Sequence, residues 1–469
     1  MKNLEFRTAA SARGGMVVMA GVPGVAAGTR VSLIDHAGRR RNGLVIRTSD
    51  AAVMVEVFEG TDGLDLERTW VRFLDEPYSL PVSRDLLGRV FNGVGQPRDG
   101  RPPIVSGQRR DINGAALNPT ARAYPREFIQ TGLSALDGMN SLTRGQKLPI
   151  FSGGGLPHNR VAAQIVRQAR LLGEAASEFV VVFAAFGVSS QDARYFQDSF
   201  EESGALERLV MFLNLADEPV IERLLTPRAA LTAAEYLAFE LDYHVLVVMT
   251  DMTAYAEALR EVAVLRGDVP ARKGYPGYLY SDLAELYERA GRIRDRRGSI
   301  TLIPVLSMPS DDITHPIPDL TGYITEGQIV LSRELHAQGI YPPVAVLPSL
   351  SRLMKDGIGG DFTREDHPHV ASQLFASYAK ALEVRGLAAI IGAEDLGEGD
   401  RRYLEFAEAF ERRFVGQGED EERDVYASLD LAWDLLSMLP VAALTRLSEE
   451  ELAKYHKGSR EPRVESRER

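Results

Sequence analysis

The sequence contains no cysteine, and this absence alone excludes several kinds of protein. Without thiols there can be no disulfide framework, no thiolate zinc site and no cysteine nucleophile. Long apolar runs are missing as well, since no stretch reaches the roughly 18 apolar residues that span a bilayer. The first fifteen residues carry no apolar block of the kind found in signal peptides. These absences predict a soluble, intracellular protein.

Positive charge is in deficit, because 54 Lys and Arg face 66 Asp and Glu and leave a net charge of −12. A field of this sign repels phosphate backbones, so nucleic acid is not expected as a main partner. Apolar residues make up 45% and charged residues 26%, which is typical of globular proteins. The 469 residues leave room for about three domains of roughly 150 residues each.

Residues 1–76 have the pattern of short strands separated by turns. Residues 52–58 place Val53, Val55 and Val57 on one face, and residues 69–74 place Val71 and Phe73 in the same rhythm. Asn42-Gly43 is a turn signal between strand candidates. Several short strands at this spacing predict a small β-barrel, closed or partly closed.

Residues 77–355 change to apolar strands that alternate with helices. The strands 178–186 and 244–251 are apolar except at their ends, and 229–240 is rich in strong helix formers. This alternation predicts a mostly parallel sheet covered on both faces, with its ligand site at the carboxyl ends of the strands. Residues 356–456 show only helical periodicity, and the polar tail 457–469 is expected to fray. The predicted fold class is therefore a multidomain α/β protein.

Three glycines, Gly153, Gly154 and Gly155, join an apolar strand to the helix that follows. A strand, a glycine-rich turn and a helix N-terminus together form the architecture of a phosphate cradle. The alternative is a tight turn followed by a helix that begins with proline. Sequence chemistry alone gives these two interpretations about equal weight.

The residues that follow the glycines argue against a working P-loop. Such a loop needs Gly-Lys-Ser/Thr at the start of the helix, where the lysine holds the terminal phosphates and the hydroxyl holds magnesium. Here Pro157, His158 and Asn159 stand at those positions. Proline has no N–H to donate, histidine is mostly neutral at physiological pH, and asparagine is a poor magnesium ligand. We therefore expect this loop to bind ATP weakly or not at all.

Residues 127–165 resemble the nucleotide-binding core of the rotary ATPase α/β superfamily, and the altered loop resembles the B subunit of V/A-type ATPases. The resemblance extends over nearly the whole chain and rests on several long motifs in the same order. These further motifs are residues 87–95, 233–261, 274–292, 315–354, 364–374 and 400–414.

The resemblance implies a hexameric ring in which three catalytic A subunits alternate with three non-catalytic, regulatory B subunits. The ring would turn a central stalk, be held by peripheral stalks, and couple ATP hydrolysis or synthesis to proton or sodium transport. It would lie in the cytoplasm, peripheral to the cell membrane. Catalytic relatives carry Gly-Glu-Arg where this sequence has Gly187-Val188-Ser189. Valine cannot act as a general base, so this chain is not expected to hydrolyse ATP by itself.

Arg352 matches the arginine that non-catalytic subunits present to the γ-phosphate of ATP in the neighbouring catalytic subunit. A guanidinium is always charged, and its planar fork fits phosphate oxygens. The resemblance therefore implies an arginine finger that acts in trans. No tightly bound cofactor and no metal of its own are expected, since ATP and magnesium would sit at the interface with the catalytic subunit. The contact residues of the weak loop would be Gly153, Gly154, Gly155, His158 and Asn159.

Other interpretations stay open at this stage. The chain could be a self-standing ring NTPase with an atypical phosphate loop, and turnover by the isolated chain would support that alternative. Asp251 is expected to be a structural carboxylate at a strand end, and His367 and His369 to be structural or exposed. A subunit interface and plain packing are equal alternatives for Tyr275, Pro276, Tyr278, Tyr323 and Glu326. Contact with the rotor and a solvated turn are equal alternatives for Glu394, Asp395, Glu398 and Asp400.

Overall fold

The computed structural model describes residues 4–457 except 14, 75, 106, 174–177 and 393. Apart from Lys457, the tail expected to fray lies outside the described residues. By its contacts the chain divides into two units. The first comprises Met1–Ala121, Val180–Ile300 and Thr314–Ile324, and the second comprises Arg122–Phe179, Thr301–Ile313 and Thr325–Arg469.

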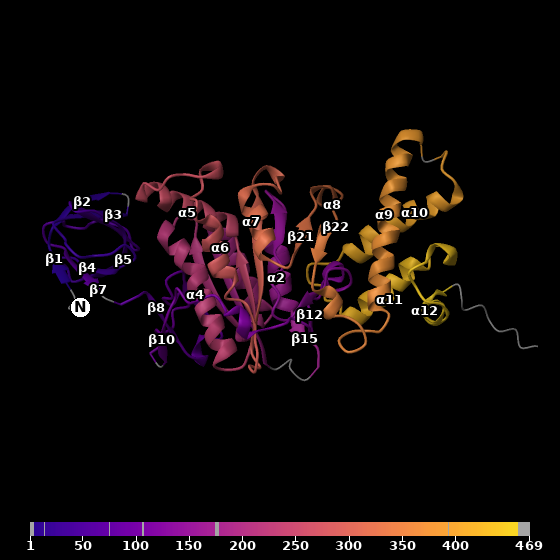
Figure 1. Cartoon of the computed structure of the whole chain (residues 1–469), viewed down its shortest axis with the longest axis horizontal. Coiled ribbons are helices and arrows are strands. Elements are labelled where there is room, and N and C mark those ends of the chain that lie inside the picture. Colours follow the sequence, from indigo (N-terminus) through magenta and orange to yellow (C-terminus); the bar gives the residue numbers. More distant parts are fainter. Residues whose placement is uncertain are drawn as a thin grey trace, which may run out of the picture. The chain divides into compact units, whose positions relative to one another are not determined.

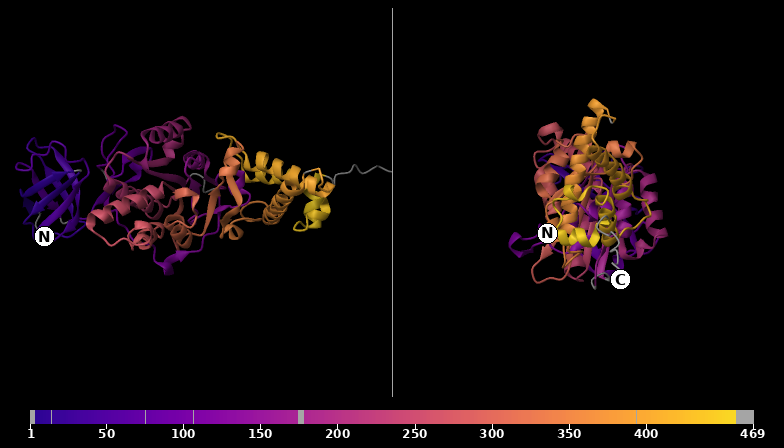
Figure 2. Two further views of the ribbon diagram at one scale, coloured as in Figure 1. Left: turned by 90° about the horizontal axis from the view of Figure 1, so that it is seen from above. Right: turned by 90° about the vertical axis from the view of Figure 1, so that its right-hand side faces the viewer.

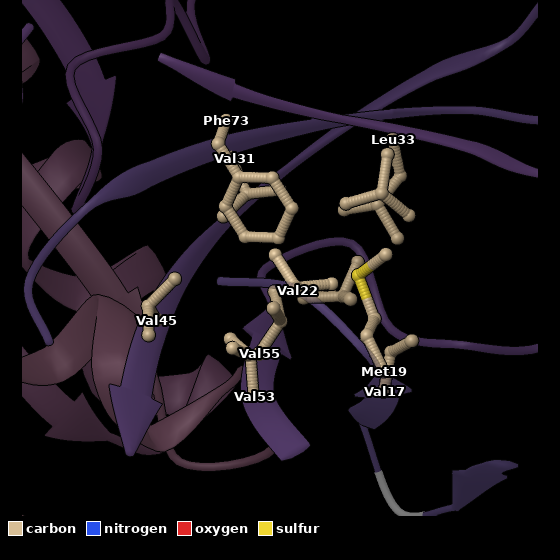
Figure 3. Close-up of a cluster of buried hydrophobic side chains, with 11 residues drawn as sticks. Val17, Met19, Val22, Val31, Leu33, Val45, Val53, Val55 and Phe73 are labelled. Carbon is tan, nitrogen blue, oxygen red and sulfur yellow. The ribbon is translucent and has the colours of Figure 1, made fainter. Parts of the chain in front are cut away.

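The first unit begins with a seven-stranded antiparallel sheet in the order β1-β7-β4-β5-β6-β3-β2. The sheet curls around a core of inward-facing valines, leucine, methionine and phenylalanine (Figures 1, 2 and 3). Gly43 is required here, because a Cβ on it would lie 2.5 Å from the carbonyl oxygen of Glu56 on the next strand. The predicted partly closed barrel is confirmed as part of the fold class. Its strands are β1 (Leu4–Phe6), β2 (Ala9–Arg13), β3 (Met16–Ala20), β4 (Arg30–Ile34), β5 (Arg40–Thr48), β6 (Ala52–Val57) and β7 (Trp70–Leu74).

The rest of the first unit is an α/β layer with strands in the order β18-β16-β17-β9. β16 pairs in parallel with β17, and β17 pairs in parallel with β9. Every residue of β18 is buried, as expected for a strand covered on both faces. The strands are β8 (Ser79–Val82), β9 (Arg89–Asn92), β10 (Gln108–Asp111), β16 (Phe179–Val188), β17 (Leu209–Leu215), β18 (His244–Thr250) and β19 (Gly291–Ile293). The helices are α3 (Ser190–Glu202), α4 (Val220–Phe239), α5 (Met252–Arg266), α6 (Leu279–Tyr287) and α7 (Pro316–Ile324).

The second unit has its own strands in the order β22-β21-β14-β20. β14 is parallel to both β20 and β21, whereas β22 returns antiparallel to β21. The strands are β11 (Arg122–Ala123), β12 (Phe128–Gln130), β13 (Leu142–Thr143), β14 (Ile150–Gly153), β15 (Arg170–Leu171), β20 (Ser299–Met308), β21 (Gly327–Leu331) and β22 (Val344–Ser351). The helices between them are α1 (Ser134–Asp137), α2 (His158–Gln168) and α8 (Arg333–Ala337).

The second unit ends in helices, drawn in orange and yellow in Figure 1. A row of aromatic rings fills their core: Tyr378 packs 4.6 Å from Phe410, and Phe410 packs 5.2 Å from Phe414, between ring centroids. The helices are α9 (His367–Ile391), α10 (Glu398–Ala409), a π-helical turn (Phe410–Val415), α11 (Val425–Leu436) and α12 (Glu449–Tyr455). The predicted fold class, with a barrel, a mostly parallel α/β region and C-terminal helices, is confirmed. Of the helices described, none has the length and apolarity needed to cross a membrane.

Candidate functional site

The glycine-rich loop lies between β14 and α2, as the sequence predicts. A Cβ on Gly153 would lie 2.2 Å from Oδ1 of Asp311, so the side chain of Asp311 would have to move to admit it. Gly155 has a backbone reason to be glycine, since its φ of 79° is in the left-handed region. A Cβ on Gly154 would meet nothing within 4 Å. Of the three glycines, Gly155 is therefore the one whose backbone conformation favours glycine.

The backbone amides of this loop are partly used within the loop itself. The amide of Leu156 donates to the carbonyl oxygen of Gly153 at 3.1 Å, and the amide of His158 donates to that of Leu156 at 2.9 Å. Pro157 lies between them and has no N–H. A phosphate cradle works by pointing such amides at the anion. Two amides of the loop are therefore bonded within the loop itself and do not point at an anion.

An ion pair lies beside the loop. Arg333 on α8 forms a bidentate pair with Asp311, with Nε 2.8 Å from Oδ2 and Nη2 2.9 Å from Oδ1. The same Nη2 donates to the carbonyl oxygen of Gly154 at 2.9 Å. The Arg333 guanidinium lowers the pKa of Asp311, so the two opposite charges face each other. Arg333 is therefore paired with a carboxylate and does not replace the missing P-loop lysine.

The arginines of α2 are also paired with carboxylates. Residues 417–423, which we call the acidic loop, lie against this helix. Arg160 bonds Glu419 with Nε 2.9 Å from Oε2, and its guanidinium lies 4.9 Å from the ring centroid of Tyr341. Arg167 reaches Asp420 at 3.3 Å. The side chains of Arg160 and Arg167 are consequently paired with carboxylates of the acidic loop.

Arg352 directly follows β22 and has a different environment. Its backbone N–H donates to the carbonyl oxygen of Glu326 at 3.0 Å, which anchors the main chain. Its side chain is exposed, and the guanidinium makes one long contact, from Nη1 to the carbonyl oxygen of Thr325 at 3.5 Å. Within residues 4–457, apart from the gaps stated above, no carboxylate lies in ion-pair distance of Arg352. The site thus presents a charged, unneutralised guanidinium on a fixed backbone.

In the first unit, Gly187-Val188-Ser189 ends β16 and begins α3. Val188 is buried, and its carbonyl oxygen accepts the amide of Ala216 at 2.8 Å. Ser189 caps α3 by accepting the amide of Asp192 at 3.0 Å. No side chain of this tripeptide can take up a proton from water as a general base.

Asp251 caps α5, where its Oδ1 accepts the amide of Thr253 at 2.7 Å, and this is the structural role that the sequence favoured. Tyr275 is buried, donates to Glu257, and packs edge-on against His315 at 5.7 Å between ring centroids. Its neighbour Pro276 is buried too. These contacts are consistent with plain packing.

Tyr278 is half-buried and donates to Asp268 at 3.0 Å. Tyr323 is 75% exposed and so remains available to a partner. Glu326 bonds within its own unit, with Oε1 2.8 Å from Nζ of Lys147.

The two histidines have different environments. His367 is fully buried at the start of α9, where Nε2 lies 3.1 Å from the carbonyl oxygen of Gly138, and burial lowers its pKa to about 4. His369 is exposed and lies 2.9 Å from Glu451. Among the described residues, no three or more His, Cys, Asp and Glu side chains are grouped so that they could hold a metal ion.

The acidic segment between α9 and α10 carries exposed carboxylates. Glu394, Asp395 and Glu398 are exposed and Asp400 is half-buried. Glu398 pairs with Arg402 one turn along α10, at 2.7 Å. The segment is thus a solvated turn in this structure that offers negative charge at its surface.

Comparison with known proteins places this geometry in a family. Residues 132–351 match the ATP synthase alpha/beta family, nucleotide-binding domain, and residues 356–456 match the C-terminal domain of V and A type ATP synthase. The V-type ATP synthase beta chain of Nitrosococcus oceani is 71% identical over 457 residues, which are 97% of this chain and 95% of that protein. The B subunit of the A-type ATP synthase of Aeropyrum pernix is 59% identical over 452 residues, which are 96% and 97% of the two chains. The chain belongs to the B-subunit family of V/A-type ATP synthases.

The solved structures include a member of similar fold. The structure described as a unique ATP synthase subunit NeqB from Nanoarcheaum equitans superposes with a TM-score of 0.73 at 41% identity, and the match covers 91% of this chain and all of that one. The resemblance seen in the sequence motifs is therefore confirmed for the B-subunit family. Sequence reasoning missed the pairings of Arg333 with Asp311 and of α2 with the acidic loop. Their partners lie 22 and about 250 positions apart, at no spacing that a motif could reveal.

Proposed function

We propose that this chain is the non-catalytic, regulatory B subunit of a V/A-type rotary ATPase or ATP synthase. As a member of the family it is a subunit of an ATP synthase complex, and other subunits of that complex are its partners. In the proposed arrangement, three copies alternate with three catalytic A subunits, and the ring contacts a central rotor and peripheral stalks. The assembly would lie peripheral to the membrane on its cytoplasmic side and couple to proton or sodium transport.

Two features support a non-catalytic role. The position of the general base is taken by the buried Val188, and the glycine-rich loop uses the amides of Leu156 and His158 internally. The chain accordingly holds no tightly bound nucleotide, and Gly153, Gly154, Gly155, His158 and Asn159 give at most weak contact to ATP. ATP with magnesium would instead be held mainly by the catalytic neighbour, at the interface with this chain.

The observation that carries the proposal is the exposed, unneutralised guanidinium of Arg352 on an anchored backbone. Such a group can reach the γ-phosphate of ATP in a neighbouring subunit and neutralise charge that develops in the transition state. Arg352 would therefore act in trans as an arginine finger. The exposed carboxylates Glu394, Asp395 and Glu398 support a contact with the rotor through the turn between α9 and α10.

The test is ATP turnover of this chain assembled with its catalytic partner, comparing the wild type with Arg352→Ala. Assembly should be retained, and turnover should fall by at least roughly 10³-fold, the effect of a lost arginine finger. Arg68→Ala, at an exposed arginine of the barrel, is the matched control and should leave turnover unchanged. Unchanged turnover of an intact Arg352→Ala complex would rule out the finger.

A further inference from the structure

Glu326 holds Lys147 and Arg352 together in the second unit. Its Oε1 lies 2.8 Å from Nζ of Lys147, and its Oε2 accepts the backbone amide of Lys147 at 2.8 Å. Its own amide donates to the carbonyl oxygen of Lys147 at 3.0 Å. Its carbonyl oxygen accepts the amide of Arg352, also at 3.0 Å. One residue therefore connects the segment before β14 to the residue that follows β22.

The ion pair lies mostly out of water. The side chain of Lys147 is 4% exposed and that of Glu326 is 30% exposed. Removing a charge from water costs free energy, so a buried ion pair is weak evidence for stability. Its geometry is fixed by two hydrogen bonds from backbone amides. The amide of Lys147 donates to Oε2 of Glu326, and the amide of Glu326 donates to the carbonyl oxygen of Lys147. This arrangement is better suited to orientation than to stabilisation.

We call the contacts of Glu326 with Lys147 and Arg352 the clamp. Further hydrogen bonds extend the clamp to Gln146, before β14, and to Ser351, at the end of β22. The side-chain amide of Gln146 donates to the carbonyl oxygen of Glu326 at 3.1 Å and lies 2.9 Å from Oγ of Ser351. Oγ of Ser351 in turn donates to the carbonyl oxygen of Ser141 at 2.8 Å. A Cβ on Gly327 would lie 2.0 Å from the carbonyl oxygen of Leu350, so the strands approach closely. The backbone is thus held at Ser351 and at Arg352 itself, while the side chain of Arg352 is exposed.

We propose that the Lys147–Glu326 ion pair is the positioning device that sets the direction of the Arg352 guanidinium. The inference rests on the proposed function, because it gives residues that support the same finger. Lys147 and Glu326 are positioning residues, since neither needs to contact the nucleotide. Misplacing a group by about 1 Å can cost roughly 10²-fold in rate, so a clamp of this kind matters to a finger that acts across an interface.

The experiment measures kcat and KM for ATP in the assembled complex for Glu326→Gln and Lys147→Met. Glu326→Gln is nearly isosteric and keeps an acceptor for the amide of Lys147, so it removes the charge with the least disturbance. We expect kcat to fall by roughly 10- to 100-fold in both variants, with KM changed by less than about 3-fold. Lys147→Arg keeps the charge and should retain most of kcat. Glu383→Gln breaks an exposed pair with Lys380 on α9 and is the matched control.

Combination with Arg352→Ala separates positioning from other roles. If the pair acts through Arg352, adding Glu326→Gln to Arg352→Ala should lower the single-turnover rate no further. A further 10-fold loss in the double variant would show that the pair acts elsewhere and would overturn the proposal. Failure of both single variants to assemble would assign the pair to folding, with the same consequence.

The two proposals can fail separately. If Arg352→Ala leaves turnover intact, the finger itself is wrong. If Arg352→Ala removes turnover while Glu326→Gln and Lys147→Met keep the wild-type kcat, the finger stands and the positioning role alone is rejected.

Discussion

At the scale of single residues, two carboxyl groups are buried at the start of α4. Oε1 of Glu56, from β6, accepts the amide of Ile221 at 3.2 Å, and Oε1 of Glu222 accepts the amide of Gly93 at 2.9 Å. Burial raises the pKa of each carboxyl to about 7, from an ordinary value of 4.5. Each group therefore binds its proton more tightly in the folded state than in the unfolded state.

This difference sets the sign of a pH effect at Glu56. The folded state binds more protons between pH 4.5 and about 7, so the stabilising contribution is complete below pH 4.5 and is lost as the pH rises to about 7. Glutamine cannot ionise, and Glu56→Gln should raise the free energy of unfolding at pH 8 by about 1–3 kcal/mol relative to its effect at pH 4.5. Urea unfolding of the full chain at the two pH values measures the difference.

A control separates this effect from the general loss of a negative charge. Glu450→Gln, at an exposed position on α12, should change unfolding equally at both pH values. If Glu56→Gln shows no more pH dependence than Glu450→Gln, the carboxyl of Glu56 is already ionised in the folded state at low pH, and the burial argument fails.

At the scale of elements, the contact between α2 and the acidic loop joins the glycine-rich loop to the C-terminal helices within the second unit. Besides its ion pairs, it includes the side-chain amide of Gln164, which donates to the carbonyl oxygen of Gly418 at 3.0 Å. Tyr341 donates from its hydroxyl to Oε1 of the same glutamine at 2.9 Å. A movement of the acidic loop would therefore also displace α2 or break these contacts.

The Arg160–Glu419 pair is the part of this contact that a double-mutant cycle can isolate. Side-chain exposures of 50% and 25% place it near the surface, so its coupling energy should be about 0.5–1 kcal/mol at low salt. The coupling should shrink at about 1 M salt, where charges are screened within about 3 Å. Arg160→Met, Glu419→Gln and the double variant, unfolded by urea, give the value. Strictly additive effects at low salt would show that the pair contributes nothing.

Much of the element pattern follows from local sequence. The largely apolar segments 178–186 and 244–251 supply most of β16 and β18, and residues 52–58, with valine at every second position, contain β6. The helix expected at 229–240 is the second half of α4, which begins nine residues earlier, at Val220, and continues through Pro227. Proline favours a break, but α4 is buried almost all round, and tertiary packing outweighs the local preference. The proposed domain boundaries remain predictions.

The site was less predictable than the fold. The glycines and the three altered loop residues could be found because their chemistry lies in adjacent positions. The clamp on Arg352 could not, because Lys147, Glu326 and Arg352 meet only after three strands have paired. A local sequence pattern predicts interactions between residues that are close in the chain. It does not predict which distant carboxylate pairs with a given cation.

At the scale of the whole molecule, the proposal requires that the isolated chain be inactive. We expect no ATP turnover above background from the purified full chain, since Val188 offers no base and the loop lacks the P-loop lysine. The measurement is phosphate release over hours, with the complex containing the catalytic partner as the positive control. Turnover that survives further purification of the chain alone would revive the alternative of a self-standing ring NTPase.

The inward hydrogen bonds of the glycine-rich loop have a consequence for a cell whose energy supply changes. A ligand stabilises a protein only as far as it binds the native state, and a loop that bonds to itself gains little from nucleotide. The melting temperature of this chain should therefore be the same at low and at high ATP concentration. In the proposed assembly, any change in the shape of this subunit would then have to come from its neighbours and not from nucleotide bound at its own loop.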